Sequence, residues 1–120
     1  FRPFCPSLLW EKREEYLKDS RDEFFMITSF DVQDDKVAKC PAVVHVDGTL
    51  RPQMVTKETN PKYWELINHF GSLTGEYIML NTSFNVMGEP IVLHPKEAIK
   101  CFFDSGMDAL ILGDFCLTKD

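Results

Sequence analysis

The first third of the chain contains two stretches rich in apolar side chains. In residues 8–17, Leu, Trp and Tyr recur at helical spacing among strong helix formers, and Ser7 stands where an N-cap is expected. This pattern predicts a helix over residues 8–17. Residues 23–30 form a continuous apolar and aromatic run of strand length, which predicts a strand buried on both faces. The charged residues 31–39 that follow predict a solvated loop.

The middle of the chain alternates between strand-type and helix-type patterns. Residues 43–46 and 50–55 are strand-type runs that flank an Asp47-Gly48 pair, so they predict a β-hairpin. Asn60 and Pro61 then suit the N-cap and first turn of a helix. We expect that helix to end at the glycines within residues 71–75.

The last third repeats this alternation in shorter segments. Apolar runs predict strands over residues 76–80, 90–93, 109–112 and 115–117. A helix is predicted over residues 94–103, with Pro95 at its first position and Gly106 as its stop. Because strands and helices are interleaved, the sequence predicts an α/β (α+β) fold with a mixed sheet, in a single domain over residues 1–120.

Composition restricts the function classes. The 120 residues are 44% hydrophobic and have a formal net charge of −6, a balance typical of a globular domain that would repel a nucleic-acid backbone. A few arginines in one cleft could still hold a small anion. The longest apolar runs are far shorter than the roughly 20 residues of a membrane span. We therefore expect neither nucleic acid nor membrane as a partner.

The cysteines and the start of the chain bear on the compartment. Cys5, Cys40, Cys101 and Cys116 are far apart and form no Cys-x-x-Cys pair, which is typical of neither a zinc site nor a dense disulfide framework. No signal peptide is in view. We expect reduced thiols and a cytoplasmic location.

Two clusters could bind a ligand. Residues 81–85, Asn-Thr-Ser-Phe-Asn, follow an apolar strand, where α/β folds place ligands, although the same side chains also form ordinary turns. In the predicted hairpin, His45 and Arg51 lie near each other, and Arg51 could grip a phosphate. The alternative is an exposed arginine and a half-buried histidine on a plain hairpin.

The opening residues Phe1-Arg2-Pro3-Phe4 place an arginine between aromatic side chains in a proline-stiffened segment. Such a segment is unusual for a frayed terminus. It is expected to be internal to a larger chain or to pack against a partner.

Several segments, in order along the chain, resemble the C-terminal, YrdC-like domain of the carbamoyltransferase family, which includes nodulation-factor and antibiotic O-carbamoyltransferases. The resemblance rests on FRPFCPS at residues 1–7, PAVVHVDGTLRPQ at 41–53, LNTSFN at 80–85, GEPIV at 88–92 and LGD at 112–114. It implies a twisted mixed sheet with flanking helices, cut at its N-terminal side from a longer enzyme.

The resemblance also implies a chemistry. The YrdC-like domain of the family uses ATP and carbamoyl phosphate to make carbamoyl adenylate, and a sugar-kinase-like N-terminal domain with a bound metal passes the carbamoyl group to an acceptor hydroxyl. No metal is expected in the present chain. Carried over, Arg51, Asn81 and Ser83 are the expected catalytic residues. The expected substrate and phosphate ligands are Arg2, His45, Arg51, Asn81, Thr82, Ser83 and Asn85.

One family element is missing: the Lys-x-Arg pair that holds phosphates should lie upstream of Phe1. Losing such contacts costs about 2–4 kcal/mol each in the transition state, so we expect the isolated fragment to be inactive. Self-association as a homo-oligomer is also expected, through apolar surface exposed at the truncated edge. Two alternatives remain open: a non-catalytic binding or docking module, and a relative of threonylcarbamoyl adenylate synthases.

Overall fold

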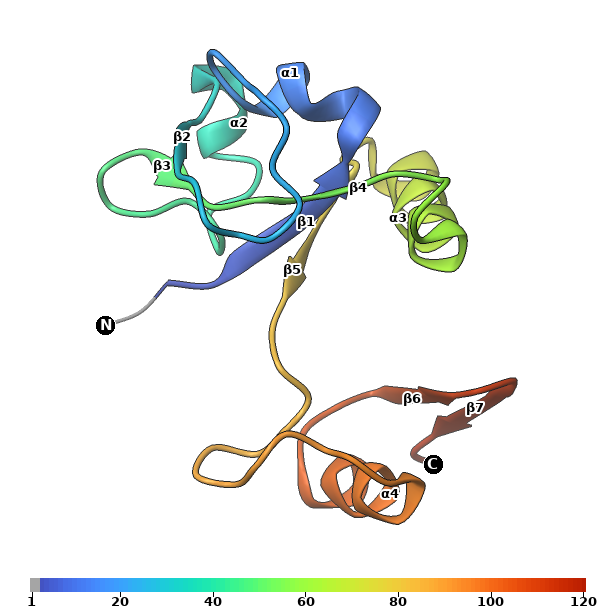
Figure 1. Cartoon of the computed structure of the whole chain (residues 1–120). Coiled ribbons are helices and arrows are strands. Elements are labelled where there is room, and N and C mark those ends of the chain that lie inside the picture. The colour runs from blue at the N-terminus through green and yellow to red at the C-terminus, as the bar shows by residue number, and fades with distance from the viewer. Residues whose placement is uncertain (1–2) are drawn as a thin grey trace. The chain divides into compact units, whose positions relative to one another are not determined.

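The computed structural model describes residues 3–120 and shows an α+β protein that divides into two compact units (Figure 1). The first unit is Phe1–Thr82 and the second is Ser83–Asp120. Helices and small sheets are interleaved along the chain, as the sequence pattern predicts. Each unit is described by itself below.

The first unit is built on a three-stranded sheet with the order β4-β1-β5. Strand β1 (Cys5–Leu9) pairs in parallel with β4 (Gln53–Val55) and antiparallel with β5 (Ile78–Asn81). The prediction of a helix over residues 8–17 is therefore wrong at its start, since only the 3-10 helix η1 (Trp10–Lys12) and helix α1 (Arg13–Tyr16) follow the strand. Sheet pairing overrides the helical propensity of these residues.

Each face of this sheet packs on its own apolar cluster. Alternation along β1 turns Leu9 toward helix α3 (Pro61–Thr74), where it meets Val55 and Ile67. Leu8 faces the opposite way and packs in a larger cluster with side chains of α1, β2 (Phe30–Asp31), β3 (Thr49–Leu50), β4 and β5 and of the neighbouring loops. That cluster includes Leu8, Tyr16, Leu17, Phe30, Val32, Leu50, Met54 and Ile78.

The apolar run of residues 23–30 does not form the predicted strand. Only its end does, as β2 (Phe30–Asp31), and Phe25 is 78% exposed. The physical cause is Glu23, a buried carboxylate that accepts hydrogen bonds from the backbone N–H groups of Phe25 and Thr28 at 3.1 and 2.5 Å. These bonds close the segment into a loop. The pKa of Glu23 is lowered, first by the side chain of Thr28 and then by backbone N–H groups that include those of Phe25 and Thr28.

The predicted solvated loop over residues 31–39 is also more structured than expected. It contains helix α2 (Asp34–Val37), and the side chain of Lys36 on this helix is buried. The Lys36 Nζ atom lies 2.8 Å from Oε2 of Glu76, at the other end of the unit's sequence. The charged residues 31–39 thus contribute to an ion pair in the interior as well as to the solvated surface.

The Asp47-Gly48 turn forms, but the predicted hairpin around it does not. Gly48 has a φ of 80°, and its N–H donates to the carbonyl of His45 at 2.9 Å, as expected for a tight turn. Strand β3 (Thr49–Leu50) then pairs antiparallel with β2 rather than with residues 43–46, which form no strand. Pairing with the more distant strand β2 is favoured because it buries Leu50 against Phe30.

Helix α3 agrees with its prediction at both ends. The Asn60 side chain caps it by accepting from the N–H of Tyr63 at 3.3 Å, and Gly75 ends it with a φ of 83°. Gly71 lies inside the helix and is buried rather than terminal. A Cβ atom there would lie 2.1 Å from the ring of Tyr77, so only glycine allows this close approach.

We expect Gly71→Ala to lower the unfolding free energy by about 2 kcal/mol, because overpacking a core costs more than the helix propensity of Ala returns. The matched control is Gly106→Ala, since a Cβ atom there meets nothing within 4 Å. Urea denaturation of both variants measures the difference. Equal stability of the two would show that Tyr77 moves aside without cost.

The second unit is a helix packed on a β-hairpin. Helix α4 (Pro95–Asp104) begins with Pro95 at its first position, and strands β6 (Ala109–Leu112) and β7 (Phe115–Thr118) pair antiparallel, as predicted. The strand predicted over residues 90–93 does not form. The small core of the unit is formed by Ala98, Phe102 and Leu110.

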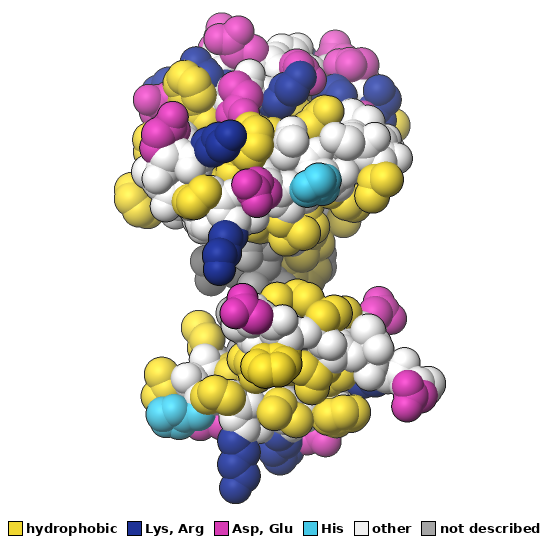
Figure 2. Space-filling model, turned by 90° about the vertical axis from the view of Figure 1, so that its right-hand side faces the viewer, with side chains coloured by type: hydrophobic (Ala, Val, Ile, Leu, Met, Phe, Trp, Pro, Cys, Tyr) yellow, Lys and Arg dark blue, Asp and Glu magenta, His cyan; other side chains and the backbone are white. Residues whose placement is uncertain are grey.

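The second unit exposes several large apolar side chains, visible as yellow atoms in the lower part of Figure 2. Leu93, Ile111 and Phe115 are each more than two-thirds exposed.

All four cysteines of the chain are free. Among residues 3–120, no helix combines the length and apolar content needed to cross a membrane.

Candidate functional site

A polar cluster lies on one face of the β4-β1-β5 sheet. In the strand register Ser7 is opposite Gln53, and Cys5 is opposite Asn81. Alternation along the strands places these side chains on the same face as Leu9, which is covered by α3. We call Cys5, Ser7, Arg51, Gln53 and Asn81 the polar cluster.

Hydrogen bonds join the members of the polar cluster in two groups, Ser7 with Gln53 and Asn81, and Arg51 with Cys5. The Ser7 hydroxyl donates to Oε1 of Gln53 at 2.8 Å, and the Asn81 amide donates to the same oxygen at 3.0 Å and to Ser7 Oγ at 3.1 Å. Arg51 donates from Nη2 to the sulfur of Cys5 at 3.2 Å. Ser7 is fully buried, whereas Arg51, Gln53 and Asn81 are half-buried and can meet a ligand.

Arg51 is the positive charge of this cluster. Within residues 3–120 it forms no ion pair with a carboxylate, and its recorded partner is a thiol. An arginine whose guanidinium is not already neutralised can bind a phosphate through paired N–H donors. The amide groups beside it can hydrogen-bond carbonyl or hydroxyl groups of the same ligand.

His45 lies in the turn before β3, away from the hydrogen bonds of the polar cluster. Its Nδ1 atom is 3.4 Å from the hydroxyl of Thr49, which itself donates to Asp47 at 2.7 Å. Its Nε2 atom is buried and has no partner within residues 3–120. The sequence grouped His45 with Arg51, but Arg51 bonds to Cys5 instead, so the structure does not join the two.

The predicted ligand segment 81–85 spans the boundary between the units. Asn81 and the exposed Thr82 belong to the first unit, whereas Ser83 and Asn85 belong to the second. The Ser83 hydroxyl donates to Oδ1 of Asn85, and Asn85 donates to the carbonyl of Glu89 at 3.1 Å. These bonds tie Ser83 and Asn85 to the turn at residues 86–89, where the N–H of Glu89 donates to the carbonyl of Val86 at 3.0 Å.

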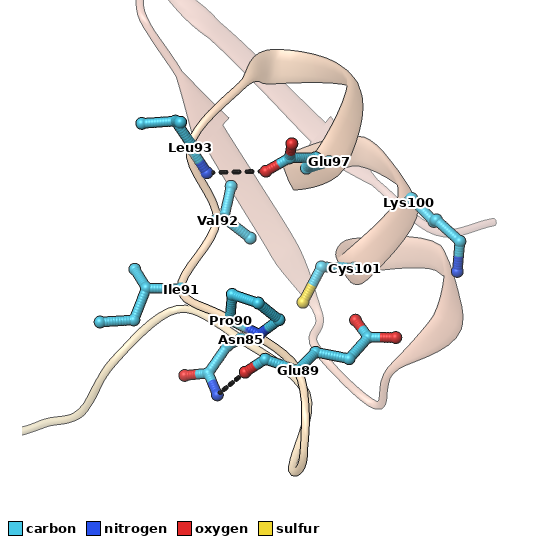
Figure 3. Close-up of a pocket in the computed structure, with 9 residues that line it drawn as sticks. All are labelled: Asn85, Glu89, Pro90, Ile91, Val92, Leu93, Glu97, Lys100 and Cys101. Atoms are coloured by element: carbon cyan, nitrogen blue, oxygen red, sulfur yellow. Dashed lines mark hydrogen bonds between the residues drawn. The ribbon is translucent and has the colours of Figure 1, made fainter.

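Asn85 also lines a cavity of about 380 Å³ in the second unit (Figure 3). The cavity lies between residues 89–93 and helix α4, and the side chain of Cys101 points into it from the helix. Glu97 on its wall accepts from the N–H of Leu93 at 2.9 Å, which lowers the pKa of that carboxyl. Glu97 is used in capping α4, so Asn85, Glu89 and Lys100 are the other polar side chains on walls that are otherwise formed by residues 90–93 and Cys101.

Arg2, the remaining predicted phosphate ligand, lies outside the described residues. Within residues 3–120 no three His, Cys, Asp or Glu side chains gather closely enough to hold a metal ion.

Ser7 and Gln53 were not predicted as site residues. Because residues 8–17 are predicted as a helix, the strand that places Ser7 and Cys5 on the same face of the sheet was not expected. The available signal was the alternation of Cys5 and Ser7 with apolar neighbours, together with the two-residue spacing of Arg51 and Gln53.

Comparison with known proteins identifies the family. A family model described as "Carbamoyltransferase C-terminus" matches residues 1–119, so the chain belongs to this family. The nodulation protein NolNO of Sinorhizobium fredii is 44% identical over 99% of this chain and 18% of its own length. NolO of Bradyrhizobium diazoefficiens is 41% identical over 99% of this chain and 22% of its own length.

Similar proteins also occur outside the rhizobia. An uncharacterized protein of Methanocaldococcus jannaschii is 39% identical over 99% of this chain and 23% of its own length. The chain thus spans about a fifth of the length of the curated relatives it matches.

Proposed function

We propose that this chain is the substrate-activating domain of an O-carbamoyltransferase, and that it binds carbamoyl phosphate and ATP to form carbamoyl adenylate. The observation that supports the proposal best is the polar cluster, in which Arg51 has no carboxylate partner within residues 3–120 and bonds to Cys5, which is opposite Asn81 in the strand register. Family membership supports the carbamoyl chemistry.

The proposed reaction requires charge neutralisation more than a nucleophilic side chain. Hydrolysis of carbamoyl phosphate would release phosphate and leave carbamate, and the carbamate oxygen would then attack the α-phosphate of ATP to give carbamoyl adenylate with release of pyrophosphate. Negative charge therefore accumulates on several phosphate oxygens. Arg51 would bind and orient phosphate, and Asn81 would hold the carbamoyl phosphate; Thr82, Ser83, Asn85, Arg2 and His45 are the further proposed ligands. Such positioning and charge stabilisation are the main sources of rate enhancement in this type of transfer.

The transfer step belongs to the rest of the proposed enzyme. An N-terminal sugar-kinase-like domain with its own metal ion would receive the carbamoyl adenylate and pass the carbamoyl group to an acceptor hydroxyl. The short span of this chain relative to its relatives is consistent with such a division of labour. We propose a cytoplasmic location for the enzyme.

The test is calorimetric titration of the chain with carbamoyl phosphate and with ATP. We expect Arg51→Ala to weaken carbamoyl phosphate binding at least tenfold, because a charged hydrogen bond to phosphate is worth about 1.5–3 kcal/mol. The matched control is Arg21→Ala, which removes an exposed arginine that stacks on Phe30 outside the polar cluster. The control is expected to bind like the unmodified chain.

Equal losses in the two arginine variants would mean that Arg51 acts only through net charge. Absence of binding to either compound would overturn the proposal and favour the alternative, a docking module that serves mainly to cover another domain.

A further inference from the structure

The β4-β1-β5 sheet has one covered edge and one open edge. At the covered edge, the N–H of Met54 in β4 turns away from β1 and donates to the carbonyl of Glu23 at 2.8 Å. Because Met54 faces outward, its neighbours in β4 bond to Leu8, and the residues on either side of Leu8 are left to bond to β5. Strand β5 forms the opposite edge of the sheet.

The backbone groups of Ile78 and Leu80 face the open edge. The N–H of Leu9 donates to the carbonyl of Tyr77 at 3.3 Å, and this pair continues the antiparallel register of β1 with β5. Successive residues of an antiparallel strand face its partner and turn away from it in alternation. Tyr77 and Met79 therefore bond toward β1, whereas Ile78 and Leu80 turn their N–H and C=O groups outward.

These outward groups have no partner. In the part of the chain that the structure describes, the N–H and C=O groups of Ile78 and Leu80 form no hydrogen bond. Ile78 is buried, so water has little access to it. Buried backbone groups without partners are rare in native proteins, because leaving them unpaired costs free energy. The edge of β5 therefore lacks a partner strand.

A groove of about 290 Å³ runs along this open edge, and β5 lines it with residues 78–80. The remaining lining comes from residues 39–43, Phe70, Thr74 and Glu76. Met79 packs in the apolar cluster under α3, whereas Ile78 packs in the opposite cluster together with Val43. Helix α3 and residues 39–43 therefore border the β5 edge on opposite faces of the sheet.

The groove suits an extended, apolar strand. A strand added to an open edge satisfies the backbone groups there, and its side chains alternate between the two faces of the sheet. Phe70 and Leu80 are exposed apolar residues of the lining that belong to neither apolar cluster of the unit. The charged side chains of the lining, Lys39 and Glu76, pair with each other at 3.5 Å. A strand with apolar residues on both faces is complementary to these surroundings.

A longer polypeptide is the source of such a strand that fits best. The curated relatives match this chain over only 18–23% of their own length, so most of each relative lies outside the matched region. A strand on the same polypeptide binds intramolecularly, at a high effective concentration. A second copy of this chain fits less well, because its own β5 edge is bordered by the same two walls, which would meet those of the first copy.

We propose that the open edge of β5 pairs with one extended, apolar strand from another part of a longer polypeptide, and that this strand lies between residues 39–43 and helix α3. With it, the sheet of the first unit contains four strands rather than three. This inference is independent of the proposed function, because Ile78, Leu80 and Phe70 are not members of the polar cluster.

The test is amide hydrogen exchange at single-residue resolution, on the isolated chain and on the longer polypeptide that contains it. The exchange rates of Ile78 and Leu80 are each divided by that of Met79, which bonds to β1 and so reports the general stability of the sheet. We expect both ratios to be at least about tenfold lower in the longer polypeptide, because a hydrogen-bonded amide exchanges only when its bond opens.

Phe70→Lys, introduced into the longer polypeptide, tests whether the strand occupies the groove. A charge on the wall should weaken the apolar contact and raise both ratios by about tenfold, while a protected Met79 shows that the sheet is folded. The matched control is Leu73→Lys, because Leu73 is an exposed apolar residue of the same helix but is not part of the groove lining. This control should leave both ratios unchanged.

Three results would overturn the proposal. The first is the same ratios in the isolated chain and in the longer polypeptide, which would mean that the edge stays open. The second is an equal effect of the two lysine variants, which would mean that the protecting strand does not lie in the groove. The third is protection of Ile78 and Leu80 in the isolated chain that increases with its concentration, which would identify a second copy as the partner.

Discussion

Replacing Glu76 with Ala is expected to lower the unfolding free energy by about 3–5 kcal/mol, the usual cost of removing one partner from a buried ion pair. Glu76 accepts from Lys36 at 2.8 Å and from the hydroxyl of the fully buried Tyr16 at 2.7 Å. Its loss would leave the buried Lys36 ammonium without its carboxylate. Urea denaturation at neutral pH measures the change.

The matched control is Lys39→Ala, because Lys39 also lies near Glu76, at 3.5 Å, but its side chain is 54% exposed. This variant should change stability by no more than about 1 kcal/mol. Replacing the pair together, as Lys36→Met with Glu76→Leu, should recover most of the loss. A Glu76→Ala variant as stable as Lys39→Ala would contradict a buried, energetically coupled pair.

The same carboxylate makes stability depend on pH. Burial alone would raise the pKa of Glu76, but the hydrogen bonds from Lys36 and Tyr16 outweigh it and hold the pKa below its ordinary value. A lowered pKa in the folded state means that the stabilisation is complete above the unfolded pKa, about 4.3, and is lost as the pH falls through the folded value. Glu76→Ala should therefore flatten the acid side of the stability profile.

Replacing Phe102 with Ala is expected to cost about 3–5 kcal/mol in the second unit, the usual range for a large buried aromatic side chain. Phe102 is fully buried, and the core around it contains only Ala98 and Leu110 as further buried members. So small a core cannot rearrange to fill the cavity that the Phe102→Ala substitution would leave. Amide hydrogen exchange in α4 and the β6–β7 hairpin should accelerate.

Phe103→Ala is the matched control for this change. Phe103 is the next residue and meets Phe102 edge to face, with ring centroids 5.1 Å apart, but it is 58% exposed. Its removal should cost less than about 1.5 kcal/mol. Equal exchange rates in the two variants would mean that Phe102 does not hold the second unit together.

The sequence predicted correctly those helices and strands whose ends are determined by residues close by in the chain. Asn60 and Gly75 bound α3, Pro95 begins α4, and Gly113 lies between β6 and β7, all as predicted. Capping, a fixed proline φ and a glycine turn act within a few residues, so sequence spacing contains the information.

The sequence pattern failed where a side-chain hydrogen bond or pairing with a distant strand decides the local structure. Residues 23–30 have the composition of a buried strand, yet the carboxylate of Glu23 closes them into a loop. Residues 43–46 were expected to pair across the Asp47-Gly48 turn, but β3 pairs with β2, which lies nearly 20 residues earlier.

The candidate site also combines features that the sequence predicts with features that only the tertiary structure shows. From the sequence alone, the segments around Arg51 and Asn81 could be singled out as ligand-binding, because residue type and family resemblance are properties of the chain itself. Only the tertiary structure joined them, since the register of β1 with β4 and β5 sets Cys5 beside Asn81 and Ser7 beside Gln53. A strand register is decided by burial on both faces of the sheet. The hydrogen bonds among Ser7, Gln53 and Asn81 therefore depend on packing between segments that lie far apart in the chain.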